Sequence, residues 1–566
     1  MEAEFQKLYT EAGEKLRDDP LIVPWDVYPR PHMRRAEWLN LNGPWELETE
    51  SGCKGSVRVP FPVESLLSGF DGEVKCGEQM TYRRSFTVPE SWRGKRVLLN
   101  LDAASRKHTV FVNGVMAGEG HSAYFPLDCD VTDMLRSGEN LLEVVCVNDL
   151  SPTHPYGKQK IERGGMWYTP CSGLWQTVWL EPVPIKHIVS LTCVSDDKGV
   201  TVKVRGVKEG TIVCEGREYE LKNGLCRIEP RTPRLWSPEE PNLYEFTVKA
   251  GEDEVQSYFA LRKIDTKTVD GVPRLCLNGK PYFFNGLLDQ GYFSDGLWTP
   301  AEPREYERDI LKMKSLGFNM LRKHIKIEPE LFYYYCDKLG MAVFQDMVNN
   351  GKYSFFRDTV LPTLGVQSFP DGRINRDKKT RKVFIDRMLA TAERLGFHPS
   401  ILYWTIFNEG WGQFDADRIY GILKEYDPTR IVDSTSGWFH QKRSDVDSLH
   451  IYFKRLRLGK KRSLPQVVSE FGGYVWKDEA HSFNPCKTYG YKILKSREAF
   501  VADLRRLYKE ELLPLIPQGL CAAVYTQVSD VEDETNGLLT YDRRVMKVKP
   551  EELSDISGAI KKALAE

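Results

Sequence analysis

The chain lacks the features that mark membrane, nucleic-acid and metal-binding proteins. No stretch of about 18 residues is apolar throughout, so a membrane-spanning helix is not expected. The 79 Lys and Arg residues nearly balance the 80 Asp and Glu residues, and the formal net charge is −1, so neither nucleic acid nor a membrane surface is an expected partner. Neither Cys-x-x-Cys nor His-Glu-x-x-His occurs, which argues against a metal site.

Cysteine pairing and a secretory signal are also missing. The 12 cysteines lie scattered, mostly inside apolar runs, which is typical of buried free thiols. The first residues are charged and lack the apolar run of a secretory signal, which predicts a cytoplasmic protein. At 566 residues, with 41% hydrophobic and 28% charged residues, the chain has the composition of a soluble globular protein. Its length predicts roughly two to four domains.

Long helical periodicity is missing from the first half of the chain. Residues 1–183 show short alternating runs broken by turn residues, which predicts a β-sandwich of the jelly-roll type. Within it, "VFVNGVMAGE" places Asn113-Gly114 between two strand-like runs, a strong hairpin signal. Residues 184–266 show the same alternating runs and turn residues with shorter strands, which is typical of a small immunoglobulin-like sandwich.

From residue 267 to residue 566 strand-like runs alternate with helical patterns. Eight strand-like runs can be distinguished, and this number predicts a (β/α)₈ barrel of the TIM type. In such barrels the C-terminal ends of the strands converge on one mouth, which carries the active site. Residues capable of chemistry are therefore expected at these strand ends.

Polar side chains stand at most of these strand ends. "ILYWTIF" reads as a strand buried on both faces, and it ends at Asn408 and Glu409. A later strand ends at Glu470, which should face Glu409 across the mouth. Further strand ends carry Arg322 with His324, Asp346, and His450 with Tyr452. Two facing carboxyl groups are the minimal machinery for cleaving a glycosidic bond, one protonated and one ionised.

The neighbours of the two glutamates predict how their roles divide. Arg322 is placed to pair with Glu470, and Tyr452 to donate a hydrogen bond to it, and both contacts favour the charged form. Glu409 follows "YWTIF" and precedes Trp411, so we expect a drier setting that keeps this group protonated. Sequence leaves open the separation, which is ~5–5.5 Å in retaining enzymes and ~6.5–9.5 Å in inverting ones.

Several of these segments resemble one enzyme family. "HPSILYWTIFNEG" resembles the acid/base segment of glycoside hydrolase family 2, and "PQVVSEFGG" resembles its nucleophile segment. "LGFNMLRKH" is similar to its second-strand motif, in which an Arg and a downstream His line the pocket. "WLNLNGPWEL" and "YRRSFTVP" resemble its sugar-binding sandwich. The resemblance covers nearly the whole chain in the family's domain order.

The resemblance implies a retaining exo-β-glycosidase that needs no cofactor. It makes Glu409 the general acid/base and Glu470 the nucleophile, with Asn408 on the sugar 2-hydroxyl and Tyr452 orienting the nucleophile. Tyr525 falls where members often carry an aromatic platform, and Trp167 falls in a loop that the sandwich sends into the barrel mouth. The remaining candidates for substrate binding are Arg322, His324, Lys326, Asp346, His450 and Trp438.

Two features of the sequence favour different terminal sugars. Family glucuronidases carry an Asn-x-Lys motif, but Glu534 and Asn536 stand there in this chain, after two further acidic residues. Against this, Lys323 and Lys326 in "RKHIK" offer positive charge for an acidic sugar. We expect a β-galactoside; the alternatives are a β-hexuronide (β-glucuronide or β-galacturonide) and a catalytically inactive carbohydrate-binding protein. Close relatives often associate, which suggests a homodimer.

Overall fold

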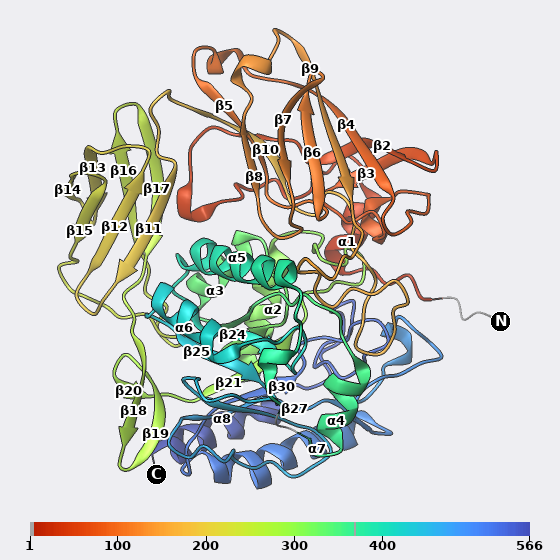
Figure 1. Cartoon of the computed structure of the whole chain (residues 1–566), viewed down its shortest axis with the longest axis vertical. Helices are drawn as coiled ribbons and strands as arrows, with labels where there is room; N and C mark the ends of the chain where they lie inside the picture. The colour runs from red at the N-terminus through yellow and green to blue at the C-terminus, as the bar shows by residue number, and fades with distance from the viewer. Residues whose placement is uncertain (1–4, 367–368, 566) are drawn as a thin grey trace.

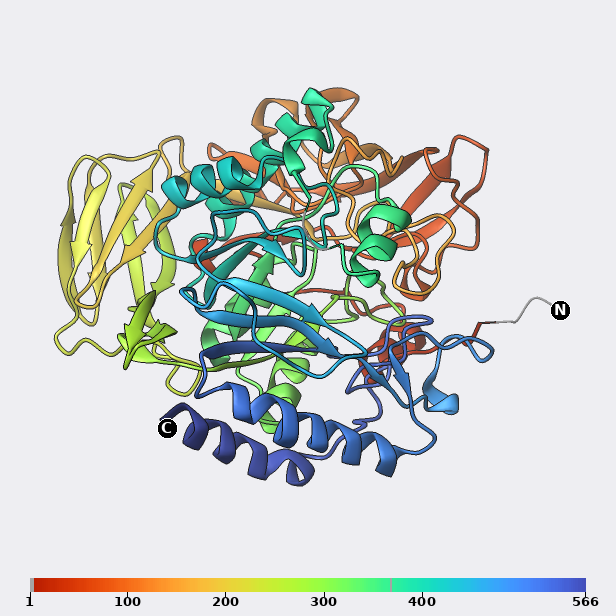
Figure 2. The same cartoon turned by 60° about the horizontal axis from the view of Figure 1, so that its bottom comes forward.

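The computed structural model describes residues 5–366 and 369–565 of the chain. Three bodies are visible in Figure 1: an orange N-terminal sandwich, a smaller yellow sandwich beside it, and a barrel coloured from green to blue. Figure 2 shows the last two long helices lying along one flank of the barrel, away from the N-terminal sandwich. The predicted fold classes of all three parts are confirmed.

The N-terminal sandwich consists of two antiparallel sheets that follow helix α1 (Glu11–Asp18). One sheet has the order β3 (Lys54–Val59), β2 (Gly43–Thr49), β4 (Gln79–Thr87), β9 (Glu139–Val147), β6 (Lys107–Val112) and β7 (Val115–Gly120). The other has the order β1 (Leu39–Asn40), β10 (Val178–Val183), β5 (Arg96–Leu101) and β8 (Leu127–Asp130). The predicted hairpin is present, because Asn113 and Gly114 both adopt the positive φ that a two-residue turn requires.

The second sandwich packs a three-stranded sheet against a four-stranded one. The first has the order β11 (Ser190–Ser195), β12 (Val200–Arg205) and β15 (Leu225–Ile228). The second has the order β14 (Arg217–Leu221), β13 (Gly210–Cys214), β16 (Tyr244–Ala250) and β17 (Asp253–Phe259). Apolar side chains that alternate along these strands meet between the sheets and form a separate core.

A small sheet that the sequence did not predict leads into the barrel. It has the order β18 (Ile264–Val269), β19 (Val272–Leu277) and β20 (Lys280–Pro281). The Leu275 backbone N–H lies 3.4 Å from Cys521 Sγ, so this sheet packs against the beginning of the last barrel strand. Our domain limits after residues 183 and 266 stay a prediction.

Eight parallel strands form the barrel. Their order is β25 (Ile431–Ser436), β24 (Ile401–Asn408), β23 (Ala342–Asp346), β22 (Met320–Lys323), β21 (Phe284–Asp289), β30 (Leu520–Thr526), β27 (Gln466–Gly472) and β26 (Asp447–Ile451). The first and last strands of this order are adjacent, because the Ser448 hydroxyl donates to the Thr435 carbonyl at 3.3 Å. The barrel is therefore nearly closed. Strand β24 is buried along its whole length, as predicted.

Helices cover the outside of the barrel. The longer ones are α2 (Arg304–Ser315), α3 (Glu330–Leu339), α5 (Lys378–Leu395), α6 (Ala416–Tyr426), α7 (Arg497–Arg506) and α8 (Pro550–Ala565). A short α4 (Leu361–Thr363) and a strand pair, β28 (Tyr474–Val475) with β29 (Lys492–Ile493), lie in the connections. Helix α5 begins at a cap in which the Asp377 side chain accepts from the Thr380 N–H.

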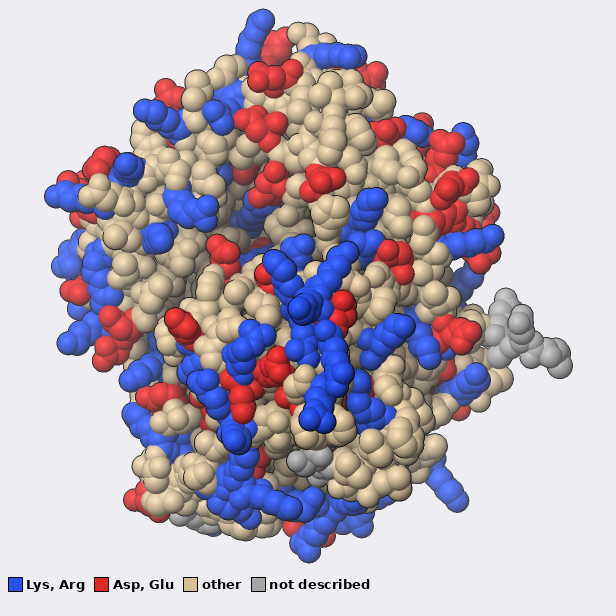
Figure 3. Space-filling model, viewed as in Figure 1, with Lys and Arg blue, Asp and Glu red and all other residues tan. Residues whose placement is uncertain are grey.

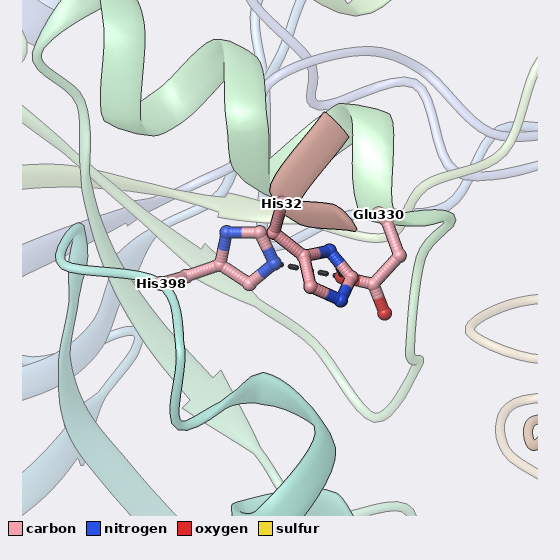
Figure 4. A group of neighbouring side chains, drawn as sticks. All are labelled: His32, Glu330 and His398. Carbon is pink, nitrogen blue, oxygen red and sulfur yellow. Dashed lines mark hydrogen bonds and ion pairs between the residues drawn. The ribbon is translucent and has the colours of Figure 1, made fainter. Parts of the chain in front are cut away.

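A cluster of buried ions anchors the turn before β24 (Figure 4). His398 Nε2 lies 2.8 Å from Glu330 Oε2, and its Nδ1 lies 2.7 Å from Asp337 Oδ2. His32, from the N-terminal segment, lies against the same Glu330 oxygen at 3.6 Å. Burial alone would lower the pKa of His398, but Asp337 and Glu330 outweigh it and raise that pKa to about 9. The cluster thus ties three distant segments together through a charged imidazole.

The surface carries charges of both signs. In Figure 3 a band of Lys and Arg side chains runs down the middle of the visible face from the region of α5, and acidic side chains flank it. Among the described residues no helix is long and apolar enough to cross a membrane.

Candidate active site

The C-terminal ends of the barrel strands bring most of the predicted residues into one site. Arg322 lies on β22, Asn408 ends β24, and Glu470 lies on β27. Glu409 follows β24 directly, and His450 lies on β26. Parallel strands in a barrel end at the same mouth, which explains why residues so distant in sequence meet here.

The two glutamates face each other across His450. One carboxylate oxygen of Glu409, one of Glu470 and a ring nitrogen of His450 all lie within 4.8 Å of one another. His450 Nδ1 is 2.8 Å from Glu409 Oε1 and 3.4 Å from Glu470 Oε2. The pair is therefore close enough for both groups to reach one anomeric carbon.

Glu470 is held in its ionised form. Arg322 Nη1 donates to Oε1 at 3.1 Å, and the Tyr452 hydroxyl donates to Oε2 at 2.8 Å. Burial alone would raise the pKa of Glu470, but His450 and Arg322 outweigh it and hold that pKa below its usual value. The Tyr452 ring stacks on Tyr491 with 3.6 Å between centroids, which fixes the direction of the hydroxyl.

Arg322 organises the floor of the site. Its guanidinium donates to Asp346 Oδ1 at 2.9 Å, to the Ser469 carbonyl at 2.9 Å and to Asn408 Oδ1 at 2.8 Å, besides Glu470. His324 lies 2.7 Å from the other Asp346 oxygen, and burial lowers the pKa of this histidine. A side chain with five donors in a fixed fork is needed to serve so many acceptors at once.

Three hydrogen bonds fix Asn408 and Glu409 at the end of β24. Because Asn408 Oδ1 accepts from Arg322, its amide N–H groups are left to donate elsewhere. Glu409 has a left-handed backbone with φ 54°, which is uncommon outside Gly, Asn and Asp. Its backbone N–H donates to the Ser436 carbonyl at 2.9 Å, and its carbonyl accepts from Trp438 Nε1 at 3.0 Å. These bonds fix the backbone from which the Glu409 side chain reaches His450.

Three models of one family match successive parts of the chain. They are the family 2 glycosyl hydrolase sugar-binding domain over residues 36–184, a family 2 domain over residues 187–262, and the family 2 TIM barrel domain over residues 271–470.

The chain belongs to glycosyl hydrolase family 2.

Named relatives in family 2 differ in the sugar that their names give. The chain is 26% identical over 478 residues to a beta-galactosidase of Aeromonas hydrophila, which covers 75% of this chain and 43% of that relative. It is 24% identical over 440 residues to a putative beta-glucuronidase of Formosa agariphila, covering 72% of this chain and 38% of the relative. The chain thus spans less than half the length of these relatives.

Solved structures show the same fold. A beta-D-glucuronidase of Dictyoglomus thermophilum superposes with a TM-score of 0.73 at 16% identity, covering 94% of this chain and 98% of the other. A beta-glucuronidase of Ruminococcus gnavus superposes with a TM-score of 0.69 at 17% identity, covering 96% of this chain and all of the other. At these identities the likeness concerns the family 2 fold alone.

Three predicted substrate contacts need correction. Lys326 donates to the Gly291 and Trp298 carbonyls at 2.6 and 2.8 Å and pairs with Glu328 at 2.9 Å, so all its donors are used inside the protein. Tyr525 is fully buried, and its hydroxyl accepts from a backbone N–H, so no sugar can stack on it. Asp346 has both oxygens occupied by Arg322 and His324, so it positions these residues rather than contacting sugar.

Trp167 and Trp438 are half-buried near Glu409, their predicted sugar contacts stay predictions, and the sequence missed several of their neighbours. Trp167 packs edge-on against Tyr353, with 4.9 Å between ring centroids. Lys158 Nζ lies 5.9 Å from the centre of the Trp167 ring. The charge of Lys158 interacts with Glu470, Glu534 and His324, so this ammonium stands near the site. Only the packing of the N-terminal sandwich on the barrel brings it there.

Two groups of His and carboxylate side chains are close enough to hold a metal ion within the described ranges. They are Glu409, His450 and Glu470, and His32, Glu330 and His398. His398 has both ring nitrogens bonded to carboxylates and a raised pKa of about 9, and a protonated imidazole has no lone pair for a metal. In the first group, His450 Nδ1 is already bonded to Glu409. The expected absence of a metal stays a prediction.

Proposed function

We propose that the chain is a retaining exo-β-glycosidase, with Glu470 as nucleophile and Glu409 as general acid/base. The observation that carries this proposal is the distance of at most 4.8 Å between carboxylate oxygens of the two residues. A separation of ~5–5.5 Å leaves no room for a water between nucleophile and sugar, so the carboxylate attacks directly. The donors on Glu470 keep this group ionised and ready to attack.

The reaction proceeds through two displacements at the anomeric carbon. In the first, a Glu470 oxygen forms a bond to C1 as the bond from C1 to the leaving oxygen breaks, and Glu409 gives its proton to that oxygen. In the second, Glu409 takes a proton from a water whose oxygen bonds to C1, and the Glu470 carboxylate is released. His450 keeps the Glu409 carboxyl group in place between the steps. Two inversions give overall retention.

Asn408 supplies transition-state stabilisation in this scheme. Its amide N–H groups are not used in the bond to Arg322, and we assign them as donors to the sugar 2-hydroxyl. Hydrogen bonds at this position strengthen as the oxocarbenium-like transition state develops, and they contribute several kcal/mol in glycosidases, on the order of 3. Arg322 donates to both Asn408 Oδ1 and Glu470 Oε1, so it fixes the amide and the nucleophile relative to each other.

A neutral β-galactoside is the substrate that we propose first. Lys323 is buried between Asp289 and Glu328, and Lys326 is equally occupied, so neither lysine of "RKHIK" is left for a uronate. Burial raises the pKa of Glu534, which lies in the acidic run after β30 and accepts from the Tyr168 hydroxyl. Wherever Glu534 is ionised, its negative charge disfavours a second carboxylate from an acidic sugar nearby.

A β-hexuronide remains the second candidate because of Lys158. This half-buried ammonium interacts with Glu470 and Glu534 and has no ion pair among the residues that the structure describes. A lysine in this position is able to bind a sugar carboxylate.

A panel of p-nitrophenyl glycosides separates these candidates. We expect the highest kcat/KM for the β-galactoside, lower values for the β-glucuronide and β-galacturonide, and none for Glu470→Gln. A uronide preference that Lys158→Met abolishes selectively would replace the first candidate with the second. Sugar binding without release of nitrophenol from any member would favour the inactive carbohydrate-binding protein instead.

A further inference from the structure

A large cavity lies beside the sugar site described above and shares Trp167 with it. It has a volume of about 850 Å³ and is formed where residues 150–167 of the N-terminal sandwich meet residues 352–355 and Tyr489 of the barrel. Ligand sites for small molecules usually measure about 300–1,000 Å³, so this cavity holds a ligand of two or three rings. Both domains must be in place for it to exist.

The cavity lies on the side of Glu409. Two of its lining residues, Tyr353 and Tyr489, interact electrostatically with the Glu409 carboxylate. Its lining residue Trp167 packs edge-on against Trp411, two positions after Glu409, with 5.3 Å between ring centroids. A general acid must reach the oxygen of the leaving group, so the leaving group lies on its side of the sugar.

The walls of the cavity are mainly aromatic and apolar. Trp167, Tyr353, Tyr489 and Phe355 contribute rings, and Ile161 is an exposed aliphatic side chain at its edge. These aromatic side chains favour a flat apolar ligand, because ring stacking adds to the free energy gained by burying apolar surface.

Two lysines give the cavity rim a positive charge. Lys160 and Lys352 line the cavity and are exposed, and neither forms an ion pair with any of the residues that the structure describes. Glu162 is the acidic residue in the same lining, so two cations face one anion. Unpaired cations at the edge of an apolar site attract a ligand that carries a negative group.

We propose that this cavity is the subsite for the leaving group and that it binds fused aromatic aglycones bearing an anionic substituent. The proposal rests on the proposed function, because the assignment of Glu409 as acid decides which side the aglycone occupies. Lys160 and Lys352 are the specificity-determining residues, and the rings of Trp167 and Tyr353 hold the aromatic part.

Binding to the inert Glu470→Gln protein tests the proposal without turnover. The probes are 4-methylumbelliferyl and 3-carboxyumbelliferyl β-galactosides, which share a sugar and a ring system; one carries a methyl group at C4 and the other a carboxylate at C3. Exposed ion pairs are individually weak, so the carboxylated probe should bind about 5-fold more tightly. This preference should disappear in Lys160→Ala/Lys352→Ala and shrink with added salt. Lys280→Ala, an exposed lysine on β20, is the matched control and should keep the preference.

Kinetics with the active enzyme give a second readout. Lys160→Ala/Lys352→Ala should lower kcat/KM for the 3-carboxyumbelliferyl galactoside and leave kcat/KM for the 4-methylumbelliferyl galactoside unchanged. Equal affinity of the two probes, with no selective effect of the double variant, would overturn the anionic part of the proposal. Tighter binding of a disaccharide than of either aryl galactoside would overturn the aromatic part.

Failure of the proposed function gives a different pattern. If no β-glycoside is hydrolysed, the catalytic assignment falls, but the cavity is still tested with the free dye 7-hydroxycoumarin-3-carboxylate by fluorescence anisotropy. Binding that Lys160→Ala/Lys352→Ala weakens and Lys280→Ala leaves unchanged would support the cavity as an aromatic anion site. Absence of binding would reject it independently of catalysis.

Discussion

The hydroxyl of Tyr452 should set the acidic limit of activity. It donates to Glu470 Oε2 at 2.8 Å inside a buried site, and a hydrogen bond to a charged acceptor contributes about 1.5–3 kcal/mol. Since one pKa unit corresponds to about 1.4 kcal/mol, removing this donor should raise the pKa of the nucleophile by about 1–2 units. Tyr452→Phe keeps the ring that stacks on Tyr491, so the change isolates the hydroxyl.

The assay is the pH dependence of kcat/KM, whose acidic limb reports the ionisation of the free enzyme's nucleophile. A donor to the charged form lowers the pKa, so its loss should move this limb to higher pH by about 1–2 units. Tyr491→Phe changes the stacked partner but keeps the donor, so its limb should stay in place. An unmoved or lowered limb in a folded Tyr452→Phe enzyme would refute the reasoning.

Two further predictions concern the acid and the buried histidine. Glu409→Ala should slow substrates with poor leaving groups most, by about 10²–10⁴-fold, and azide should partly rescue it with a β-glycosyl azide product; an α-azide would contradict retention. His398 has a folded pKa raised from 6.5 to about 9, so its stabilisation is complete below pH 6.5 and is lost as pH rises through 9. Urea unfolding should show a loss of about 3 kcal/mol over this window, and His398→Asn should flatten the slope.

The architecture could be predicted from the sequence because it depends on local patterns that tertiary packing does not override. Strand β24 was recognisable because eight consecutive buried residues leave few other structures open to it. Helix α5 begins at Lys378 because the side chain of Asp377 caps it, and such a cap is a local signal. The sheet β18–β20 was missed because its strands are short and join a sandwich to a barrel without a change in composition.

Side-chain direction was harder to predict than strand position. Lys323 alternates with Arg322 along β22 and so points out of the barrel, toward Asp289 and Glu328. Lys326 lies beyond the end of that strand, where alternation no longer applies, and two of its partners, the Gly291 and Trp298 carbonyls, come from another connection. Tyr525 was misjudged because its position in the motif does not reveal whether its ring faces the cavity or the core.

Features that depend on contacts between domains could not be predicted. A segment of the N-terminal sandwich reaches the barrel mouth, where it forms the cavity beside Glu409 and brings Lys158 close to Trp167. The periodicity of that segment does not reveal which part of the barrel it contacts. The segment was marked only by Trp167. The electrostatics of the nucleophile were partly predictable, since Arg322 and Tyr452 stood at strand ends, whereas the bridging place of His450 was not.

The most direct test of the central claim is covalent labelling of the nucleophile. A 2-deoxy-2-fluoro β-galactoside with a good leaving group slows the second displacement more than the first, so the glycosyl-enzyme accumulates. We expect mass spectrometry of the digested protein to find one fluoroglycosyl group, on the peptide that contains Glu470. A label on Glu409 or on any other residue, or hydrolysis of the ordinary galactoside with inverted configuration, would contradict the account.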